Sequence, residues 1–314
     1  MNILENLCLK LAAEKSELYK FINTTPHRYK VYSIPKRNGV GTRTIAQPSR
    51  AVKVLQELAL SLISEKLPVH SSAMAYIKGK NIKENAIRHK QNQYILKMDF
   101  KDFFHSIKPN DFVQHAKKHL GKLDDTDEFI LAKLFFWAPK DGLGPRLSIG
   151  APSSPLISNT ILYQFDLRLS NHIEKSKITY TRYADDLTFS TNIKNNLREI
   201  PTLVQEICKN LSYPQLTINE SKTTFSSKAN NRHITGLVLT NENEISLGRE
   251  RKRKIRSLVF KFKKNELDEK SILNLRGQLS FSKHVEPIFY ISLEKKYSLE
   301  TIQEIQSFQS NNSN

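Results

Sequence analysis

The sequence predicts an α+β fold, and three observations support this class. Residues 178–190 contain two strand-forming stretches on either side of an acidic turn, which is the pattern of a β-hairpin. The apolar stretch 94–98 has the length and composition of a buried strand. Residues 157–173 and 249–264 repeat apolar side chains at helical spacing, so we expect long helices between and after the strands.

Two adjacent carboxylates, Asp185 and Asp186, lie at the predicted hairpin turn. Asp is common in turns, so an exposed acidic turn is the ordinary interpretation. Asp99 favours a different interpretation of the two carboxylates. It ends the predicted strand 94–98, and it lies close to Asp185 and Asp186 if that strand is next to the hairpin. Taken alone, Asp99 is equally compatible with a helix cap or a salt bridge. Three converging carboxylates suit Mg²⁺, and such clusters hold two ions about 3.5–4 Å apart.

Three motifs, in the same order along the chain, resemble those of reverse transcriptases. Residues 183–186 (Tyr-Ala-Asp-Asp) resemble the YxDD motif, and Asp99 with Phe104 five residues later resembles the first palm motif. Residues 150–159 resemble the intervening G-x-P-x-S-P-x-x-x-N segment. One motif alone would be weak, but the three together are specific. The resemblance extends from about residue 28 to about residue 300.

The resemblance implies a right-hand polymerase with fingers, palm and thumb, in which helices back an antiparallel palm sheet and the thumb is helical. The expected segments are an N-terminal helical extension (1–24), fingers (25–92), a first palm segment (93–110), fingers helices (111–148), the palm with its acidic hairpin (149–246), a basic helical thumb (247–306) and a disordered tail (307–314).

The resemblance also implies an RNA-directed DNA polymerase that uses two Mg²⁺ ions, with Mn²⁺ as an alternative. Its expected metal ligands are Asp99, Asp185, Asp186 and the carbonyl of Phe100. Lys222 lies in a segment that resembles the one after the palm hairpin, and it is expected to protonate the departing pyrophosphate.

Residues 34–45 resemble the fingers hairpin, and the Asn38-Gly39 pair within them is a hairpin-turn signal. Lys36 and Arg43 are expected near the incoming triphosphate. The triphosphate is a polyanion, and it favours cations that can hydrogen-bond to its phosphate oxygens. The alternative is an ordinary basic surface hairpin.

Phe104 is expected to exclude a ribose 2′-OH, so that DNA is made; its alternative is a plain core residue. Gly150 is expected in the nucleotide pocket. Ile149 departs from the family, since many reverse transcriptases carry a Gln there that helps to hold the nucleotide sugar. That contact is therefore in doubt here, and Ile149 is expected to close the pocket by packing.

Residues 85–89 resemble the NAxxH motif of retron reverse transcriptases, with Asn85 and His89 as its defined positions. Thr235 and Gly236 resemble the T-G part of a second retron motif. This subfamily implies a cognate structured non-coding RNA as a partner, which is copied from the 2′-OH of an internal guanosine into a branched RNA–DNA hybrid (msDNA). It further implies dNTPs, an effector protein encoded nearby, defence against phages, and template removal by a host RNase H.

The net charge of +18 favours a polyanionic partner. Cations gather in residues 249–264, and their mutual repulsion is relieved if an anion covers the helix. A solvated surface helix is the alternative. We expect this helix to contact the backbone of an RNA-containing duplex. The residues expected to do so are Arg251, Lys252, Lys254 and Arg256.

The sequence contains no apolar stretch long enough to span a bilayer, and charges interrupt its N-terminus. Cys8 and Cys208 form neither a metal-binding spacing nor a disulfide framework, which favours a reducing compartment. A cytoplasmic location without membrane contact is therefore expected.

Three alternatives to a retron enzyme remain at this point. One is another bacterial reverse transcriptase, of the group II intron or diversity-generating type. The second is a non-catalytic RNA-binding scaffold, although three clustered acids without metal would only destabilise it. The third is a two-metal nuclease, which would need neither a fingers hairpin nor a phenylalanine that excludes ribose.

Overall fold

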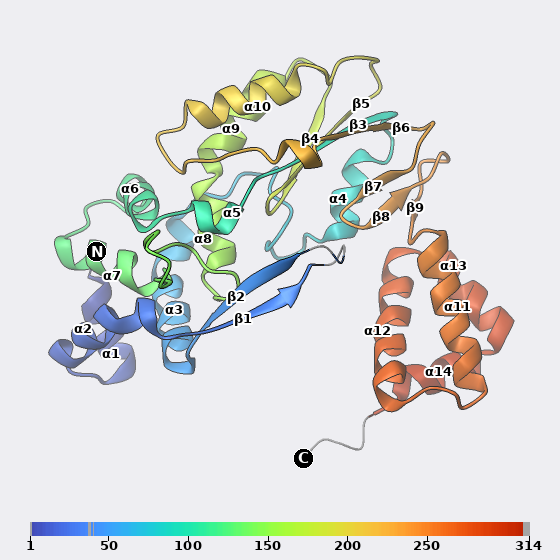
Figure 1. Cartoon of the computed structure of the whole chain (residues 1–314), viewed down its shortest axis with the longest axis horizontal. Helices are drawn as coiled ribbons and strands as arrows, with labels where there is room; N and C mark the ends of the chain where they lie inside the picture. The colour runs from blue at the N-terminus through green and yellow to red at the C-terminus, as the bar shows by residue number, and fades with distance from the viewer. Residues whose placement is uncertain (1, 37–38, 40, 310–314) are drawn as a thin grey trace. The chain divides into compact units, whose positions relative to one another are not determined.

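The computed structural model describes residues 2–36, 39 and 41–309, and the chain divides into two compact units (Figure 1). The larger unit contains the residues up to Lys80 and Leu96–Thr224, and the smaller unit contains Asn81–Ile95 and the residues from Phe225 onward. Of the three boundaries along the chain, the first lies just before α4 (Ile82–His89), and the other two lie within the strands β3 (Tyr94–Asp99) and β6 (Thr224–Ser227).

The larger unit combines helices with two separate sheets. Its α-helices are α1 (Ile3–Leu11), α2 (Lys15–Thr24), α3 (Arg50–Ile63), α5 (Phe103–Ser106), α6 (Pro109–His119), α7 (Asp125–Leu134), α8 (Ser154–Ile161), α9 (Tyr163–Ile173) and α10 (Ile200–Lys209). Its 3₁₀ turns are η1 (Thr25–His27), η2 (Ser64–Lys66) and η3 (Glu220–Lys222). Its remaining strands are β1 (Tyr29–Pro35), β2 (Thr42–Pro48), β4 (Thr179–Tyr183) and β5 (Asp186–Thr191).

The N-terminal helices are anchored to α7 by polar and apolar contacts. Ile3 and Leu7 are fully buried on one face of α1. The backbone N–H of Ile3 donates to the Asp127 carboxylate at 2.8 Å, which satisfies one of the free amides in the first turn of α1. The helical extension predicted for residues 1–24 is thus present as two short helices.

Strands β1 and β2 form an antiparallel hairpin that runs from Tyr29↔Pro48 to Pro35↔Thr42. Most of β1 is exposed, whereas β2 buries Ile45 and Ala46. This is the hairpin that the sequence predicts for residues 34–45, and its predicted turn residue Asn38 lies outside the described residues.

The second sheet of this unit has the strand order β4-β5-β3-β6. Strands β4 and β5 pair antiparallel, and Tyr183 lies opposite Asp186, so Ala184 and Asp185 form a two-residue turn. The sequence prediction of an acidic hairpin turn is confirmed. Helix α9 packs near this sheet through Phe165, whose ring meets Phe100 edge-to-face at a centroid distance of 5.3 Å.

The single helix predicted for residues 157–173 is wrong in one respect, because the structure divides it into α8 and α9 at Leu162. Leu162 has φ −84° and ψ 3°, which takes its backbone out of the α-helical hydrogen-bond pattern. The apolar spacing continues through the break, so the sequence pattern does not reveal it.

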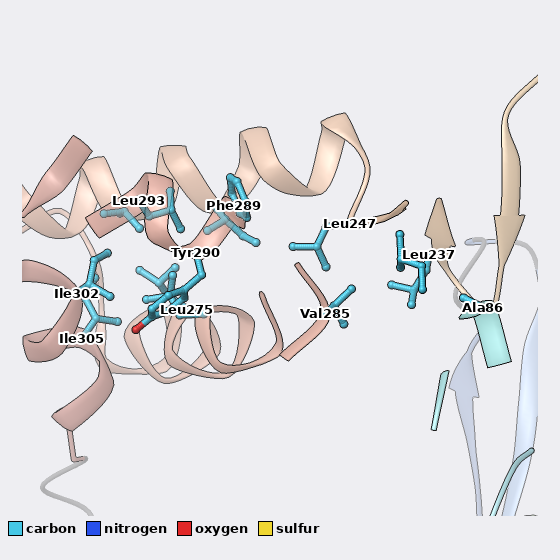
Figure 2. Packing of buried hydrophobic residues seen from close by; sticks show 14 of the residues in the cluster. Ala86, Leu237, Leu247, Leu275, Val285, Phe289, Tyr290, Leu293, Ile302 and Ile305 are labelled. Atoms are coloured by element: carbon cyan, nitrogen blue, oxygen red, sulfur yellow. The ribbon is translucent and has the colours of Figure 1, made fainter. Parts of the chain in front are cut away.

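The smaller unit contains α4 (Ile82–His89), a sheet of β7 (Arg232–Ile234), β8 (Leu237–Leu239) and β9 (Ile245–Ser246), and four C-terminal helices. These helices are α11 (Arg249–Lys263), α12 (Glu269–Val285), α13 (Pro287–Tyr297) and α14 (Leu299–Ser307). A continuous apolar core runs from Ala86 and Leu237 to Ile305 (Figure 2). Residues 81–92, which the sequence assigned to the fingers, therefore pack with β7–β9 in this unit.

Candidate active site

The structure brings together the three carboxylates that the sequence singled out. Asp99 ends β3, Asp185 lies in the hairpin turn and Asp186 begins β5. One carboxylate oxygen from each of these residues lies within 4.8 Å of the other two. Asp99 is almost fully buried, whereas Asp186 is exposed. The cluster therefore has one face closed by protein and one open to solvent.

Backbone hydrogen bonds fix this geometry from both sides. The N–H of Phe100 donates to the Asp185 carbonyl at 3.2 Å, which joins the end of β3 to the hairpin turn. On the other side the N–H of Asn219 donates to the Asp99 carbonyl at 2.7 Å. Ala184 has φ 58°, a left-handed conformation that is strained for any residue with a Cβ. The two-residue turn imposes this conformation on Ala184. Asp185 completes the turn, and Asp186 follows it as the first residue of β5.

The electrostatics of the cluster fit a divalent cation. Burial, followed by the charges of Asp185 and Asp99, raises the pKa of Asp186 to about 7. Burial and the Asp99 charge also raise the pKa of Asp185. A positive ion would stabilise the charged forms of Asp185 and Asp186, and carboxylate oxygens are the ligands that Mg²⁺ prefers. These residues therefore fit the expected metal, while the role predicted for the Phe100 carbonyl stays a prediction.

Lys222 is the cation nearest to the cluster for which the structure gives a contact. Its Nζ donates to an Asp99 carboxylate oxygen at 2.8 Å. Burial lowers the pKa of Lys222, but the hydrogen bond and the charges of the three acids outweigh burial and raise it. The side chain is about half exposed, so it is free to reorient once a metal neutralises Asp99.

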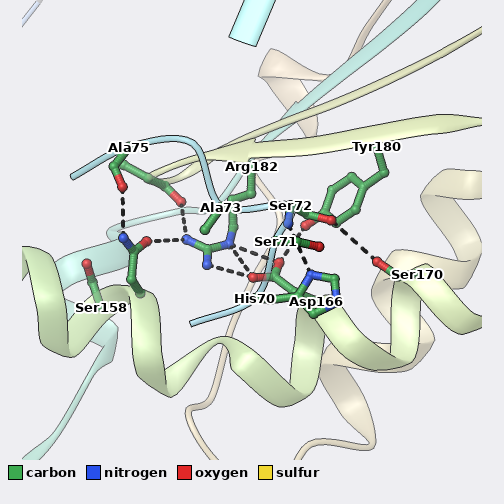
Figure 3. A network of polar contacts seen from close by, with 12 residues as sticks. His70, Ser71, Ser72, Ala73, Ala75, Ser158, Asp166, Ser170, Tyr180 and Arg182 are labelled. Carbon is green, nitrogen blue, oxygen red and sulfur yellow. Dashed lines mark hydrogen bonds and ion pairs between the residues drawn. The ribbon is translucent and has the colours of Figure 1, made fainter. Parts of the chain in front are cut away.

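Beneath the hairpin lies a buried polar network that the sequence analysis missed (Figure 3). Arg182 of β4 is fully buried, and its guanidinium donates to both Asp166 oxygens, at 2.6 Å in the closest contact. It also donates to the side chain of Asn159 at 3.1 Å and to the Ala184 carbonyl at 3.2 Å. Tyr180 adds a hydrogen bond to Asp166 at 2.7 Å. Arg182 thus connects α8 and α9 directly to the acidic turn.

A signal for this network was available in the sequence. Arg182 lies between strand-forming residues whose alternation places it on the inner face of β4, where an unpaired cation would be costly. Asn159 is the last residue of the G-x-P-x-S-P-x-x-x-N segment. What the sequence could not supply was the partner, because Asp166 is one of many acids on helices.

The residues expected to bind nucleotide lie in the larger unit but differ in exposure. Lys36 and Arg43 are exposed on the β1–β2 hairpin. Phe104 is half-buried on α5, and its ring packs edge-to-face against Phe103 at a centroid distance of 5.2 Å. Their roles stay predictions.

Gly150 is held against β2, since a Cβ there would lie 3.1 Å from Gln47 and 3.2 Å from the Ala46 carbonyl. Its φ of 120° also disfavours any other residue. The neighbouring Ile149 accepts a backbone hydrogen bond from Ala46 at 2.9 Å. The 149–150 segment is therefore fitted closely to the fingers hairpin, and a side chain at position 150 would push the two apart.

The residues expected to recognise RNA divide into buried and exposed groups, all within the smaller unit. Asn85 and His89 are fully buried on α4, so in this structure they support the fold and are not accessible to a ligand. Burial lowers the pKa of His89 to about 3, which keeps it neutral. The hydroxyl of Thr235 donates to the Ile82 carbonyl at 3.4 Å, and Gly236 follows it in the β7–β8 turn. The second retron-like motif thus contacts the helix that carries the first.

The four cations expected to contact RNA from α11 also differ among themselves. Arg251 lies over the Phe281 ring at 5.3 Å, and Arg256 lies over Phe289 at 5.1 Å. Lys252 is paired with the Glu286 carboxylate. Lys254 is fully on the exposed face. Part of the positive charge on this helix therefore stabilises the unit itself.

Comparison with known proteins gives one consistent result. A family model described as reverse transcriptase (RNA-dependent DNA polymerase) matches residues 34–239. The chain is 43% identical over 283 residues to the retron Ec83 reverse transcriptase of Escherichia coli, covering 89% of this chain and 90% of that protein. It is 34% identical to the retron Ec73 enzyme (87% and 88% covered) and 32% identical to the retron Ec86 enzyme (95% and 91% covered), both also from Escherichia coli.

The predicted α+β right-hand polymerase class is confirmed. Across the described residues, every helix is too short or too polar to cross a membrane.

Proposed function

We propose that this chain, which belongs to the reverse transcriptase family, is the polymerase of a retron. Its RNA-directed DNA polymerase activity follows from that family. The assignment to a retron is supported above all by the 43% identity to a retron enzyme over nine-tenths of both chains. The acidic cluster supports catalysis, because a scaffold would gain nothing from a cluster in which the ionisation of Asp185 and Asp186 is unfavourable.

Asp99, Asp185 and Asp186 are the residues that would hold two Mg²⁺ ions, or Mn²⁺ in their place. Bound there, the ions supply the chemistry of nucleotidyl transfer: they lower the pKa of the primer hydroxyl and neutralise the triphosphate and the leaving pyrophosphate. The rigid turn held by Arg182 fixes two of these acids relative to the third. Lys222 is cationic and adjacent to the cluster, so it is placed to give a proton to a pyrophosphate oxygen.

On this proposal, Lys36 and Arg43 of the fingers hairpin bind the triphosphate, and Gly150 lies in the nucleotide pocket. Phe104 restricts the space beside the sugar. Replacing it with Ala is expected to admit ribonucleotides, because the ring that excludes a 2′-OH is lost. The measurement is the ratio of kcat/KM for a deoxynucleotide to that for the matching ribonucleotide. An unchanged ratio in an active Phe104→Ala enzyme would remove this assignment.

The template on this proposal is a dedicated structured RNA, copied from an internal guanosine 2′-OH into msDNA. The basic face of α11 contacts the duplex backbone, and the contact of the second retron-like motif, in the β7–β8 turn, with α4 shapes the surface that the RNA reads. A host RNase H removes template, and an effector protein encoded nearby completes a phage-defence system in the cytoplasm. These partners are proposed on the basis of the family resemblance. Exposed cations such as Lys254 are compatible with a nucleic-acid partner.

The test is to isolate the protein from its host and analyse the nucleic acid that accompanies it. After RNase treatment, the wild-type sample should yield a small single-stranded DNA that retains a ribonucleotide branch at its 5′ end. The same preparation from an Asp185→Asn, Asp186→Asn variant should contain RNA alone.

The other outcomes reject parts of the proposal separately. DNA synthesis on a primed RNA in vitro, without a branched product in the host, would assign the chain to another bacterial reverse transcriptase lineage. RNA alone in both samples, together with no synthesis in vitro, would indicate a non-catalytic RNA-binding scaffold.

A further inference from the structure

Tyr76 is an exposed aromatic residue whose backbone is held in an unfavourable conformation. Its φ is 61°, in the left-handed region, where a bulky side chain is an outlier. Such conformations are unfavourable and persist only where surrounding structure imposes them. The residue is 53% exposed, so its own packing does not account for the strain.

The segment before Tyr76 is fixed by backbone hydrogen bonds along the free edge of β4. The N–H of Arg182 donates to the Ser72 carbonyl, and the N–H of Met74 donates to the Arg182 carbonyl, both at 2.8 Å. Asn159 Nδ2 donates to the Ala75 carbonyl at 2.8 Å (Figure 3). Residues 72–75 are therefore held by Arg182 and Asn159. Arg182 also holds the acidic turn, through the Ala184 carbonyl.

The direction of this contact leads the chain toward the acidic turn. Ala73 pairs with Arg182 in a parallel bridge, so the two segments run in the same direction. Beyond the bridge, Asn159 binds the Ala75 carbonyl next to Tyr76, and Arg182 binds the Ala184 carbonyl next to Asp185. At that point the left-handed backbone turns the chain away from β4 and leaves the ring exposed to solvent.

The charges around Tyr76 agree with this placement. Burial, followed by the negative charge of Asp185 and by Tyr183, raises the pKa of its hydroxyl, whereas Arg43 opposes the shift. Arg43 also lowers the pKa of Asp185. Tyr76 is thus within electrostatic reach of both the acid cluster and the fingers cation that we assign to the triphosphate.

We infer that Tyr76 is a nucleotide-positioning residue, whose exposed ring packs against the base of the incoming deoxynucleotide. A base presents a flat apolar face whatever its identity, and an aromatic ring beside it stabilises binding without sequence preference. The strained backbone is the cost of presenting this ring next to the metal-binding acids. The inference rests on the proposed polymerase function and adds a contact to the base, where Lys36, Arg43 and Phe104 address the phosphates and the sugar.

The experiment compares Tyr76→Phe, Tyr76→Ala and Tyr76→Gly in steady-state synthesis on a primed RNA template. Loss of the ring in the Ala and Gly variants should raise KM for the dNTP about tenfold, which corresponds to about 1.4 kcal/mol. The value of kcat at saturating dNTP should stay within about twofold, since uniform binding energy is removed. The Phe variant keeps the ring and should match the wild type.

The Gly variant separates the ring from the backbone, because glycine adopts a left-handed φ without strain. If the backbone strain rather than the ring determined KM, the KM values of the Ala and Gly variants would differ from each other. Tyr19→Ala is the matched control, since Tyr19 is also exposed but stacks on Phe129 in the N-terminal helices. Its KM should not change.

An unchanged KM in both Tyr76→Ala and Tyr76→Gly would overturn the inference, as would a loss confined to kcat, which would indicate a structural role of the 72–75 segment. In either case the wild-type enzyme still polymerises, so the proposed function survives. A wild-type enzyme without templated synthesis would overturn both.

Discussion

Each unit of the chain buries an arginine completely, and the two arginines differ in their partners. In the larger unit, Arg182 meets a carboxylate, Asp166, so its pKa is raised although burial alone would lower it. In the smaller unit, Arg232 donates to the backbone carbonyls of Asn92 and Thr240, and burial lowers its pKa. Arg182 is therefore part of an ion pair, whereas Arg232 joins two backbone segments through hydrogen bonds to their carbonyls.

This difference corresponds to what each unit has to position. The larger unit must hold acids together in a strained turn, which requires a directional network anchored to α8 and α9. The smaller unit is stabilised mainly by the apolar side chains of its helices and sheet (Figure 2). An exposed cation such as Lys254 can therefore contact an external partner without loss of that core. Four experiments test this contrast.

Replacing Asp185 with Asn should produce the largest effect. Activity is expected to fall by more than about a hundredfold, because the loss of a residue one shell further from a metal already costs 10–100-fold. In the presence of a chelator, however, the variant should unfold at a higher temperature than the wild type. The substitution removes a carboxylate whose ionisation is unfavourable in the folded chain. Thermal unfolding with and without Mg²⁺ measures this. A lower unfolding temperature in the chelator would contradict the electrostatic account.

Replacing Arg182 with Met should cost about 3–5 kcal/mol, because it leaves Asp166 buried without its partner. Arg232→Met is the matched variant in the smaller unit, and about 1–3 kcal/mol is expected there, from carbonyls that lose a donor. Urea unfolding gives both values. The double variant Arg182→Met, Asp166→Leu should recover much of the stability but not the activity, because the Ala184 carbonyl is no longer held. Recovery of activity in the double variant would show that the network does not position the turn.

His89 should make the smaller unit sensitive to acid. Its pKa is about 3 in the folded chain and about 6.5 when unfolded, so between these values only the unfolded chain takes up the proton. Stability is complete above pH 6.5 and falls as the pH decreases, by about 2 kcal/mol at pH 5. In a series of urea titrations, His89→Gln should lack this part of the pH dependence. Parallel curves for the variant and the wild type would mean that His89 does not carry it.

The smallest effect should distinguish two neighbouring lysines of α11. Lys254→Gln is expected to reduce the salt slope of duplex binding by up to about one, with little change in stability, because this side chain is exposed. Lys252→Gln should instead cost about 1 kcal/mol of stability and leave the salt slope unchanged, because Lys252 is paired with Glu286. Binding of an RNA–DNA duplex across a salt series measures the slopes. Equal slopes for the two variants would contradict this division of the helix.

Much of the acidic site was predictable, because its signals are local. A strand that ends on Asp99 and a hairpin that turns at Asp185 and Asp186 are each encoded within a dozen residues, and the structure places them as expected. The break at Leu162 was not predictable, since an apolar repeat continues on both sides of it. The contact residues on α11 were predicted only as a group, because spacing alone does not reveal that Lys252 pairs with Glu286.

The sequence by itself thus determined the acidic hairpin, the strand that ends on Asp99, the identity of the three acids and the excess of positive charge. The tertiary structure alone decided that Asp166 neutralises Arg182, that α4 packs with the C-terminal segment, and that the segment before Tyr76 pairs with β4. The physical reason is the range of the interactions. Strand, turn and helix preferences act between near neighbours, whereas a buried charge takes its partner from whichever distant element the fold brings within hydrogen-bonding distance.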